Sequence, residues 1–266
     1  MRSFQYWPAK EVQDKAAELR IQREAAPAKP ADGKVRLLPY PGGREVRRGF
    51  FANVDWHRGT KASVFLPWDP ASYVVVDLPE AIFCQNGLLY LAHAHIPTIW
   101  DQQNLVIQNI DWTREANGGL RHERVLPNKV AFGAAIQPKV GSVDMELWLR
   151  NGSDQTLTGL RVQICGHLKG APEFNDQTTT NKLFQPPSVA VHSVGGDRWI
   201  ITAWERCGRS WGQPLVPCIH ADPVFPDCAP GETVRVRGRL WFYQGKDIDA
   251  ELARAKADFP ALAQSK

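Results

Sequence analysis

Two histidines separated by one residue are the first feature of this 266-residue chain that points to chemistry. His93 and His95 lie in the run LLYLAHAHIPTIW, which is typical of a strand, so we expect their side chains to leave the same face. Such a pair is typical of two metal ligands, or of two donors that hold one polar ligand. Two histidines that form hydrogen bonds within the core fit the same pattern.

A second candidate is His167, in the segment LRVQICGHL. Apolar residues alternate along this segment with a polar set made of Arg161, Gln163, Cys165 and His167. Alternation with a period of two predicts a strand whose polar residues share one face. That face is typical either of a solvated surface or of a hydrogen-bonding groove.

Glu205 is the third candidate, because it lies directly between Trp204 and Arg206. Aromatic surroundings raise the pKa of a carboxyl group, which suits a general acid or base, whereas the neighbouring arginine opposes that shift. Glu205 is therefore a candidate for proton transfer.

The five cysteines give weaker signals. Cys207, Cys218 and Cys228 fall in one loop-rich stretch, where one disulfide among them is compatible with the spacing. A cysteine nucleophile is not favoured, since no partner base is marked near Cys84, Cys165 or Cys207. The chain also has no glycine-rich phosphate loop and no Gly-x-Ser-x-Gly motif.

Composition indicates a globular chain, with 43% hydrophobic and 23% charged residues. The net charge of +4 comes from scattered lysines and arginines, so we expect no nucleic-acid partner. We expect no membrane span either, because no apolar run approaches the roughly 18 residues that one needs. The first 26 residues show no signal peptide, which predicts a cytoplasmic protein as the chain stands, or a periplasmic or secreted one if a leader was removed.

Three regions must position these candidates. Residues 1–34 are predicted to form a helix over 10–25 and a proline-rich linker, and residues 35–245 a β-sandwich domain. Residues 246–266 are predicted to hold a C-terminal helix packed on the sandwich, because Ile248, Leu252 and Ala255 recur at helical spacing.

About a dozen short runs rich in β-branched and aromatic residues predict the strands of the middle region. They include SVFLPW, YVVVDL, LLYLAHAHI, LVIQNIDW, VAFGAAI, VDMELWLR, LRVQICGHL, VAVHS, RWIITAWE and TVRVRGRLWFY. Asn151-Gly152 after VDMELWLR predicts a tight turn. Many strands with few helices predict an all-β fold, a large antiparallel β-sandwich with short terminal helices.

Three stretches of the chain resemble the galactose mutarotase (aldose 1-epimerase) superfamily. LAHAHIPTIW is similar to the segment that supplies a sugar-contacting histidine, and MELWLRNGSDQTLTGLRVQICGHLKG to the strands that lead to the catalytic histidine. The third stretch, from Trp204 to Tyr243, is similar to the closing segment, with Glu205 in the place of the catalytic base. It continues through His220, Phe225-Pro226 and Pro230-Gly231-Glu232 in the same order.

This resemblance implies a mutarotase-like sandwich and acid/base catalysis on a sugar ring, with His167 as the acid and Glu205 as the base. His93, His95, Arg206, His220 and Trp204 would then bind a small sugar or an oligosaccharide. No metal or organic cofactor is implied. The chain departs from the family in the residues around His167 and in having His-Ala-His where the family has His-Gly-Gly.

Two other hypotheses keep the sandwich. In one, a divalent transition metal is bound by His93, His95 and His220, with His192 or Asp222, for lyase, isomerase or oxygen chemistry. In the other, the chain binds a glycan through its tryptophans without catalysis.

Overall fold

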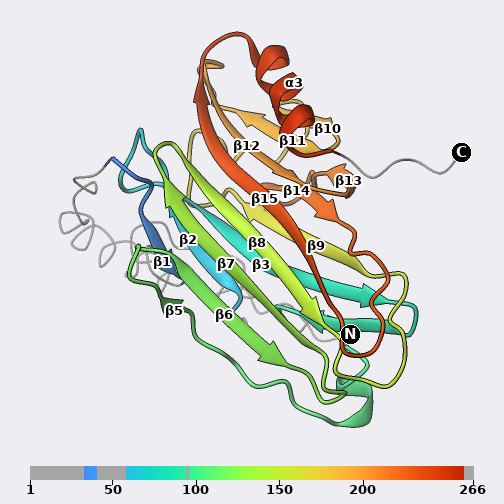
Figure 1. Cartoon of the computed structure of the whole chain (residues 1–266). Coiled ribbons are helices and arrows are strands. Elements are labelled where there is room, and N and C mark those ends of the chain that lie inside the picture. The colour runs from blue at the N-terminus through green and yellow to red at the C-terminus, as the bar shows by residue number, and fades with distance from the viewer. Residues whose placement is uncertain (1–32, 41–57, 94–95, 261–266) are drawn as a thin grey trace, which may run out of the picture.

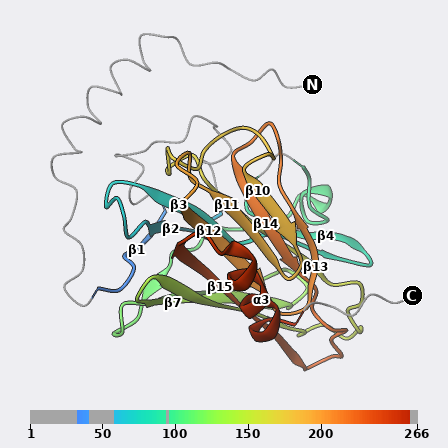
Figure 2. The same ribbon diagram turned by 90° about the horizontal axis from the view of Figure 1, so that it is seen from above.

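The computed structural model describes residues 33–40, 58–93 and 96–260, and these form two antiparallel sheets (Figures 1 and 2). The seven-stranded sheet has the order β1-β2-β3-β9-β14-β13, and β4 also pairs with β3. Its strands are β1 (Leu37–Pro39), β2 (Lys61–Phe65), β3 (Tyr73–Cys84), β4 (Gly87–Leu91), β9 (Arg161–His167), β13 (Cys207–Trp211) and β14 (Cys218–Pro223).

The second sheet has eight strands in the order β10-β11-β12-β15-β8-β7-β6-β5. They are β5 (Thr113–Arg114), β6 (Leu120–Val125), β7 (Ala131–Lys139), β8 (Ser142–Arg150), β10 (Lys182–Gln185), β11 (Ser188–His192), β12 (Arg198–Trp204) and β15 (Thr233–Gln244). The predicted all-β antiparallel sandwich is confirmed.

One main core lies between the sheets and follows from the alternation of the strands. In β8, Val143, Met145, Leu147 and Leu149 are all buried. The same core receives Val162 and Ile164 from β9 of the other sheet. Residues next to them in sequence therefore point to the outer face of the seven-stranded sheet, away from the eight-stranded one.

The C-terminal helix α3 (Ile248–Asp258) is confirmed and begins at Asp247, whose side chain accepts a hydrogen bond from the backbone N–H of Ala250. Leu252 packs against Trp199 and Ile201 on the eight-stranded sheet, and both views place the helix beside that sheet (Figures 1 and 2). No helix in the described part of the chain is long and apolar enough to cross a membrane.

One predicted strand is wrong, and the predicted tight turn at Asn151-Gly152 does not join two paired strands. LVIQNIDW, residues 105–112, forms no strand: Leu105 and Val106 are exposed, whereas Trp112 turns inward and donates from Nε1 to the carbonyl of Lys61. Asn151-Gly152 does not close a hairpin, because the chain passes from β8 to β9 in the other sheet. The buried Asn151 side chain instead donates to the carbonyls of Gln155 and Cys228.

A short 3-10 helix, η1 (Asp101–Gln103), follows β4. The predicted helix over 10–25 and the linker after it lie outside the described residues.

Candidate functional site

The outer face of the seven-stranded sheet carries a buried polar cluster, which we call the outer-face cluster. It is built by four neighbouring strands and the bend after β4, since the register pairs Asp77 of β3 with Lys61 of β2 and Cys165 of β9, and His167 of β9 with Cys218 of β14. These side chains alternate with core residues such as Val76 and so share the outer face. The members of the cluster are Lys61, Asp77, Glu80, His93, Gln163, Cys165, His167, Cys218, His220 and Asp222.

Glu80 is at the centre of the cluster. The β3–β9 ladder is irregular between Asp77 and Ala81, and this local break lets the Glu80 side chain reach the outer face. One Glu80 oxygen lies 2.9 Å from Nε2 of His93, and the other accepts a hydrogen bond of 2.7 Å from Gln163. That second oxygen also lies 3.7 Å from Nδ1 of His220.

Electrostatics keep Glu80 ionised. Burial alone would raise the pKa of Glu80, but the hydrogen bond with His93 and the charge of His220 outweigh it and lower that pKa to about 2. Glu80 is thus a fixed buried negative charge at neutral pH, held by groups from three other segments.

Beside Glu80 lies a buried ion pair between Lys61 of β2 and Asp77 of β3. The hydroxyl of Thr60 donates to the other oxygen of Asp77 over 2.9 Å. Burial raises the pKa of Asp77, and the charge of Lys61 partly offsets that rise. The pair adds a second fixed carboxylate next to Glu80.

At the far side of the cluster, two cysteines meet one histidine. Nε2 of His220 lies 3.1 Å from Sγ of Cys218, and the ring of Trp211 stacks on His220 with centroids 4.0 Å apart. The hydrogen bond from Cys165, together with His220, lowers the pKa of Cys218 to about 5 in spite of burial. Burial lowers the pKa of His220, but the contact with Cys218 outweighs it and raises that pKa.

Asp222 lies on β14 at the same end of the cluster as Cys218 and His220. Its carboxylate accepts hydrogen bonds from the backbone N–H of Ile164 and from Nε1 of Trp211. Burial raises the pKa of Asp222 to about 6.

His167 lies at the end of β9, 5% exposed, and its Nδ1 accepts from the backbone N–H of Lys169. Burial, followed by the charge of Lys61, lowers the pKa of His167 to about 3. The charge of Glu80 acts in the opposite direction and offsets part of that lowering of the His167 pKa.

The structure does not bring Glu205 to this cluster. Glu205 follows β12 in the other sheet, and its carboxylate binds both the backbone N–H and the side chain of Arg237. Its neighbour Arg206 is joined to Val224, just beyond the end of β14. Burial would raise the pKa of Glu205, but Arg237 lowers it, contrary to the rise expected from aromatic neighbours.

Some of the other predicted ligand-binding residues lie in the outer-face cluster and others lie elsewhere. His93 and His220 belong to the outer-face cluster, whereas Trp204 is fully buried between the sheets and Arg206 donates from Nε to the carbonyl of Val224. His95 lies outside the described residues. The prediction that His93 lies on a strand face is wrong, because β4 ends at Leu91 and His93 lies in the bend that follows.

The disulfide that the spacing allows does not form: Cys207, Cys218 and Cys228 are free thiols, as are Cys84 and Cys165. Each of the three has its own polar neighbour, which is Ser210 for Cys207, His220 for Cys218 and the carbonyl of Glu232 for Cys228.

Sequence reasoning missed Glu80, Asp77 and Lys61. Two carboxylates inside YVVVDLPEAIFC, an otherwise apolar strand, are a signal, since buried charges need partners. The alternation Cys218-x-His220-x-Asp222 is a second signal, because it puts three polar side chains on one strand face.

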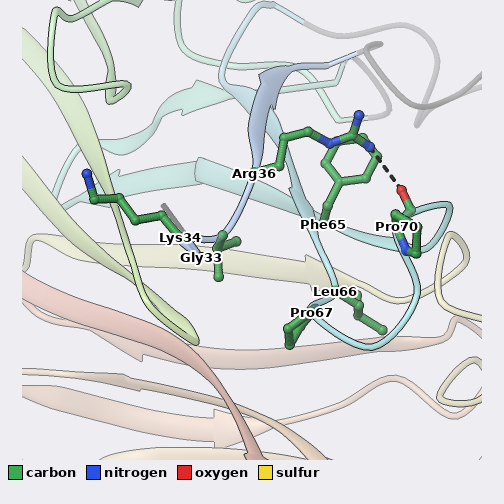
Figure 3. A pocket seen from close by; sticks show the side chains of 8 residues that line it. Gly33, Lys34, Arg36, Phe65, Leu66, Pro67 and Pro70 are labelled. Carbon is green, nitrogen blue, oxygen red and sulfur yellow. Dashed lines mark hydrogen bonds between the residues drawn. The ribbon is translucent and has the colours of Figure 1, made fainter. Parts of the chain in front are cut away.

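A separate surface pocket lies at the edge of the molecule and is not this site (Figure 3). The described residues that line it are mostly apolar, among them Phe65, Leu66 and Pro67. The guanidinium of Arg36 covers the ring of Phe65 and donates to the carbonyl of Pro70 (Figure 3).

No model of a protein family matches the sequence, and no curated protein does. Comparison with solved structures finds similar folds at low identity. A Synechocystis protein is 12% identical, with a TM-score of 0.41 over 82% of this chain and 98% of its own. YeaD of Salmonella typhimurium, provisionally assigned as a mutarotase, is 8% identical, with a TM-score of 0.36 over 69% of this chain and 87% of its own.

A human-microbiome protein provisionally assigned as a kojibiose phosphorylase is 6% identical, with a TM-score of 0.40 over 70% of this chain. The chain spans about a quarter, 26%, of that protein. With TM-scores below 0.5, these similarities bear neither on the substrate nor on the residues of the site.

Proposed function

We propose that this chain is an enzyme that moves protons on a sugar or a related small polyhydroxylated molecule, and that the outer-face cluster is its site. One observation carries the proposal. His93 and His167, to which the sequence resemblance gives sugar contact and catalysis, lie in one buried cluster: His93 contacts Glu80, and His167 is on β9, on the same face as Gln163, which donates to Glu80.

In this proposal Glu80 replaces Glu205 as the carboxylate that works with His167. The His167 imidazole takes the proton of the anomeric hydroxyl, and the same group, now imidazolium, gives a proton to the ring oxygen as the hemiacetal opens. Burial keeps His167 neutral before the reaction, with a pKa of about 3, and the negative charge of Glu80 opposes that effect when the imidazolium forms. Rotation and reclosure complete the epimerisation, with no net gain or loss of protons.

The remaining contacts support this division of roles. His93 and Gln163 each hold one oxygen of Glu80, so the carboxylate is fixed before a substrate arrives. The resemblance implies that His93 contacts a substrate hydroxyl; because His93 is bonded to Glu80 and Lys61 to Asp77, a substrate would have to share these contacts.

The test is the rate at which the anomers of D-galactose and D-glucose interconvert, followed by polarimetry. We expect the wild type to accelerate the reaction, and His167→Asn and Glu80→Gln each to lower the acceleration about 10²- to 10⁴-fold. Glu205→Gln is the matched control and should retain it, because Glu205 is bound to Arg237 in the other sheet.

If Glu205→Gln loses activity and Glu80→Gln keeps it, the catalytic pair is His167 with Glu205, as predicted from the sequence, and the pair His167 with Glu80 is wrong. If a sugar stabilises the wild type but the wild type accelerates the interconversion of neither D-galactose nor D-glucose anomers, the catalytic proposal is wrong. The chain would then be a glycan-binding protein.

A further inference from the structure

We propose that Cys165, Cys218 and His220 bind one Zn²⁺. Their ligand atoms all lie within 4.8 Å of one another, and all three side chains are buried. Two sulfurs and one imidazole nitrogen are a donor set typical of zinc. This site goes beyond the proposed activity and does not rest on it.

The strands themselves create the cluster. Cys218 and His220 are two residues apart on β14, so they share the outer face, with Ile219 pointing into the core. β9 pairs with β14 at His167 and Cys218, which places Cys165 diagonally across from Cys218 on the same face.

The surroundings of His220 are a second, independent observation. Its Nε2 faces Cys218, while Nδ1 faces Glu80 at 3.7 Å and makes no hydrogen bond to any residue that the structure describes. A zinc-bound histidine usually directs its other ring nitrogen at a carboxylate, which fixes the tautomer and the ring orientation. Glu80 is in turn held by His93 and Gln163, and Trp211 stacks on the ring.

The ligand set differs from the one predicted by sequence, since His93 is occupied by Glu80 and only His220 is shared. A second group of ligand-type residues, Asp77, Glu80 and His93, is also close together. Its carboxylates already pair with Lys61 and His93, so a cation there would compete with a buried ammonium. In the cysteine group the buried ammonium of Lys182 interacts with Cys218, but it donates to the carbonyls of Asp176 and Thr178 and to Asn181.

Tetrahedral zinc takes four ligands, and the described residues supply three. The fourth position is then filled by another group or by an exchangeable molecule.

The test is the metal content of the full chain, purified without chelators and measured by mass spectrometry of the elements. We expect about one zinc per chain, and loss of most of it in Cys165→Ser, Cys218→Ser and His220→Gln. Cys228→Ser is the matched control, because Cys228 is a buried thiol bonded only to nearby carbonyls, and it should keep the metal.

Two further measurements do not depend on the folding of those variants. Cobalt exchanged into the wild type should give the charge-transfer absorption of thiolate ligands and the visible bands of tetrahedral cobalt. Glu80→Gln should weaken zinc affinity about 10- to 100-fold in a competition titration, as expected when the carboxylate behind a ligand histidine is removed.

A wild type that neither contains zinc nor takes it up after reduction would overturn the proposal. So would zinc retained in both cysteine variants, or a Cys165–Cys218 disulfide in the freshly purified protein. None of these results bears on the proton-transfer proposal, which is tested separately by the interconversion of sugar anomers.

Discussion

At the residue scale, this chain buries several ionisable side chains, and the contacts of each decide its charge. Glu80 is the clearest case, because burial alone would neutralise it, yet hydrogen bonding with His93 and the charge of His220 keep it ionised. His122 of β6 is the opposite case. Burial first of all, with Arg124 and Arg121 adding to it, lowers the pKa of His122 to about 4, and the hydrogen bond between its Nε2 and the carbonyl of Leu78 offsets this only in part.

This depressed pKa predicts how stability depends on pH. Between pH 6.5 and 4 the unfolded chain binds a proton at His122 that the folded chain does not, so stability is complete above pH 6.5 and falls as the pH drops toward 4. The free energy of unfolding, measured with denaturant at pH 7 and pH 4.5, should fall between these pH values in the wild type. In His122→Phe this fall should be smaller by about 2 kcal/mol. Equal losses in the wild type and the variant would contradict the assignment.

At the element scale, β12 and β15 meet where glycine is required by packing. A Cβ at Gly238 would lie 2.4 Å from the indole of Trp204, which is fully buried in the core and pairs with Gly238 across the two strands. The large indole and the missing side chain therefore fit each other, and neither can be changed alone.

Gly238→Ala is expected to lower the free energy of unfolding by about 1 to 3 kcal/mol, because the indole has no room to move. Gly195→Ala, at an exposed turn where the nearest side-chain atom is an aspartate oxygen, serves as the control and should change it by less than about 0.5 kcal/mol. Urea unfolding of both variants checks the prediction, which fails if the two lose equal stability.

At the scale of the whole molecule, the sandwich leaves two outer faces with different coverings. On the seven-stranded sheet the outer face carries the polar cluster, whereas on the eight-stranded sheet it is apolar around Ala190, Trp199 and Ile201. Helix α3 covers that apolar patch with Leu252, and Trp241 of the sheet donates to Glu251 of the helix.

If α3 folds as one unit with the sandwich, Leu252→Ala should destabilise the whole domain by about 2 to 5 kcal/mol in a single transition. Ala253→Ser, on the exposed side of the same helix, should be nearly neutral. Two separate transitions, monitored by tryptophan fluorescence and by circular dichroism, would show instead that the helix docks independently.

The sequence by itself determined what depends on neighbours along the chain. Alternation with a period of two was enough to predict most strands, the all-β antiparallel class, the shared face of Gln163, Cys165 and His167, and the buried side of the C-terminal helix. It failed at residues 105–112, where an apolar run has no strand to pair with, because pairing is not a local property.

Only the tertiary structure decided which of those faces meet. β3, β9 and β14 are far apart in sequence, and their pairing brings Glu80, His167 and His220 into one cluster while leaving Glu205 with Arg237 in the other sheet. The physical reason is that strand pairing depends on how much apolar surface the two sheets bury together in the core. That total depends on both sheets and cannot be read from any single segment. The candidate site follows from that choice, as does the position of Cys165 beside Cys218 and His220.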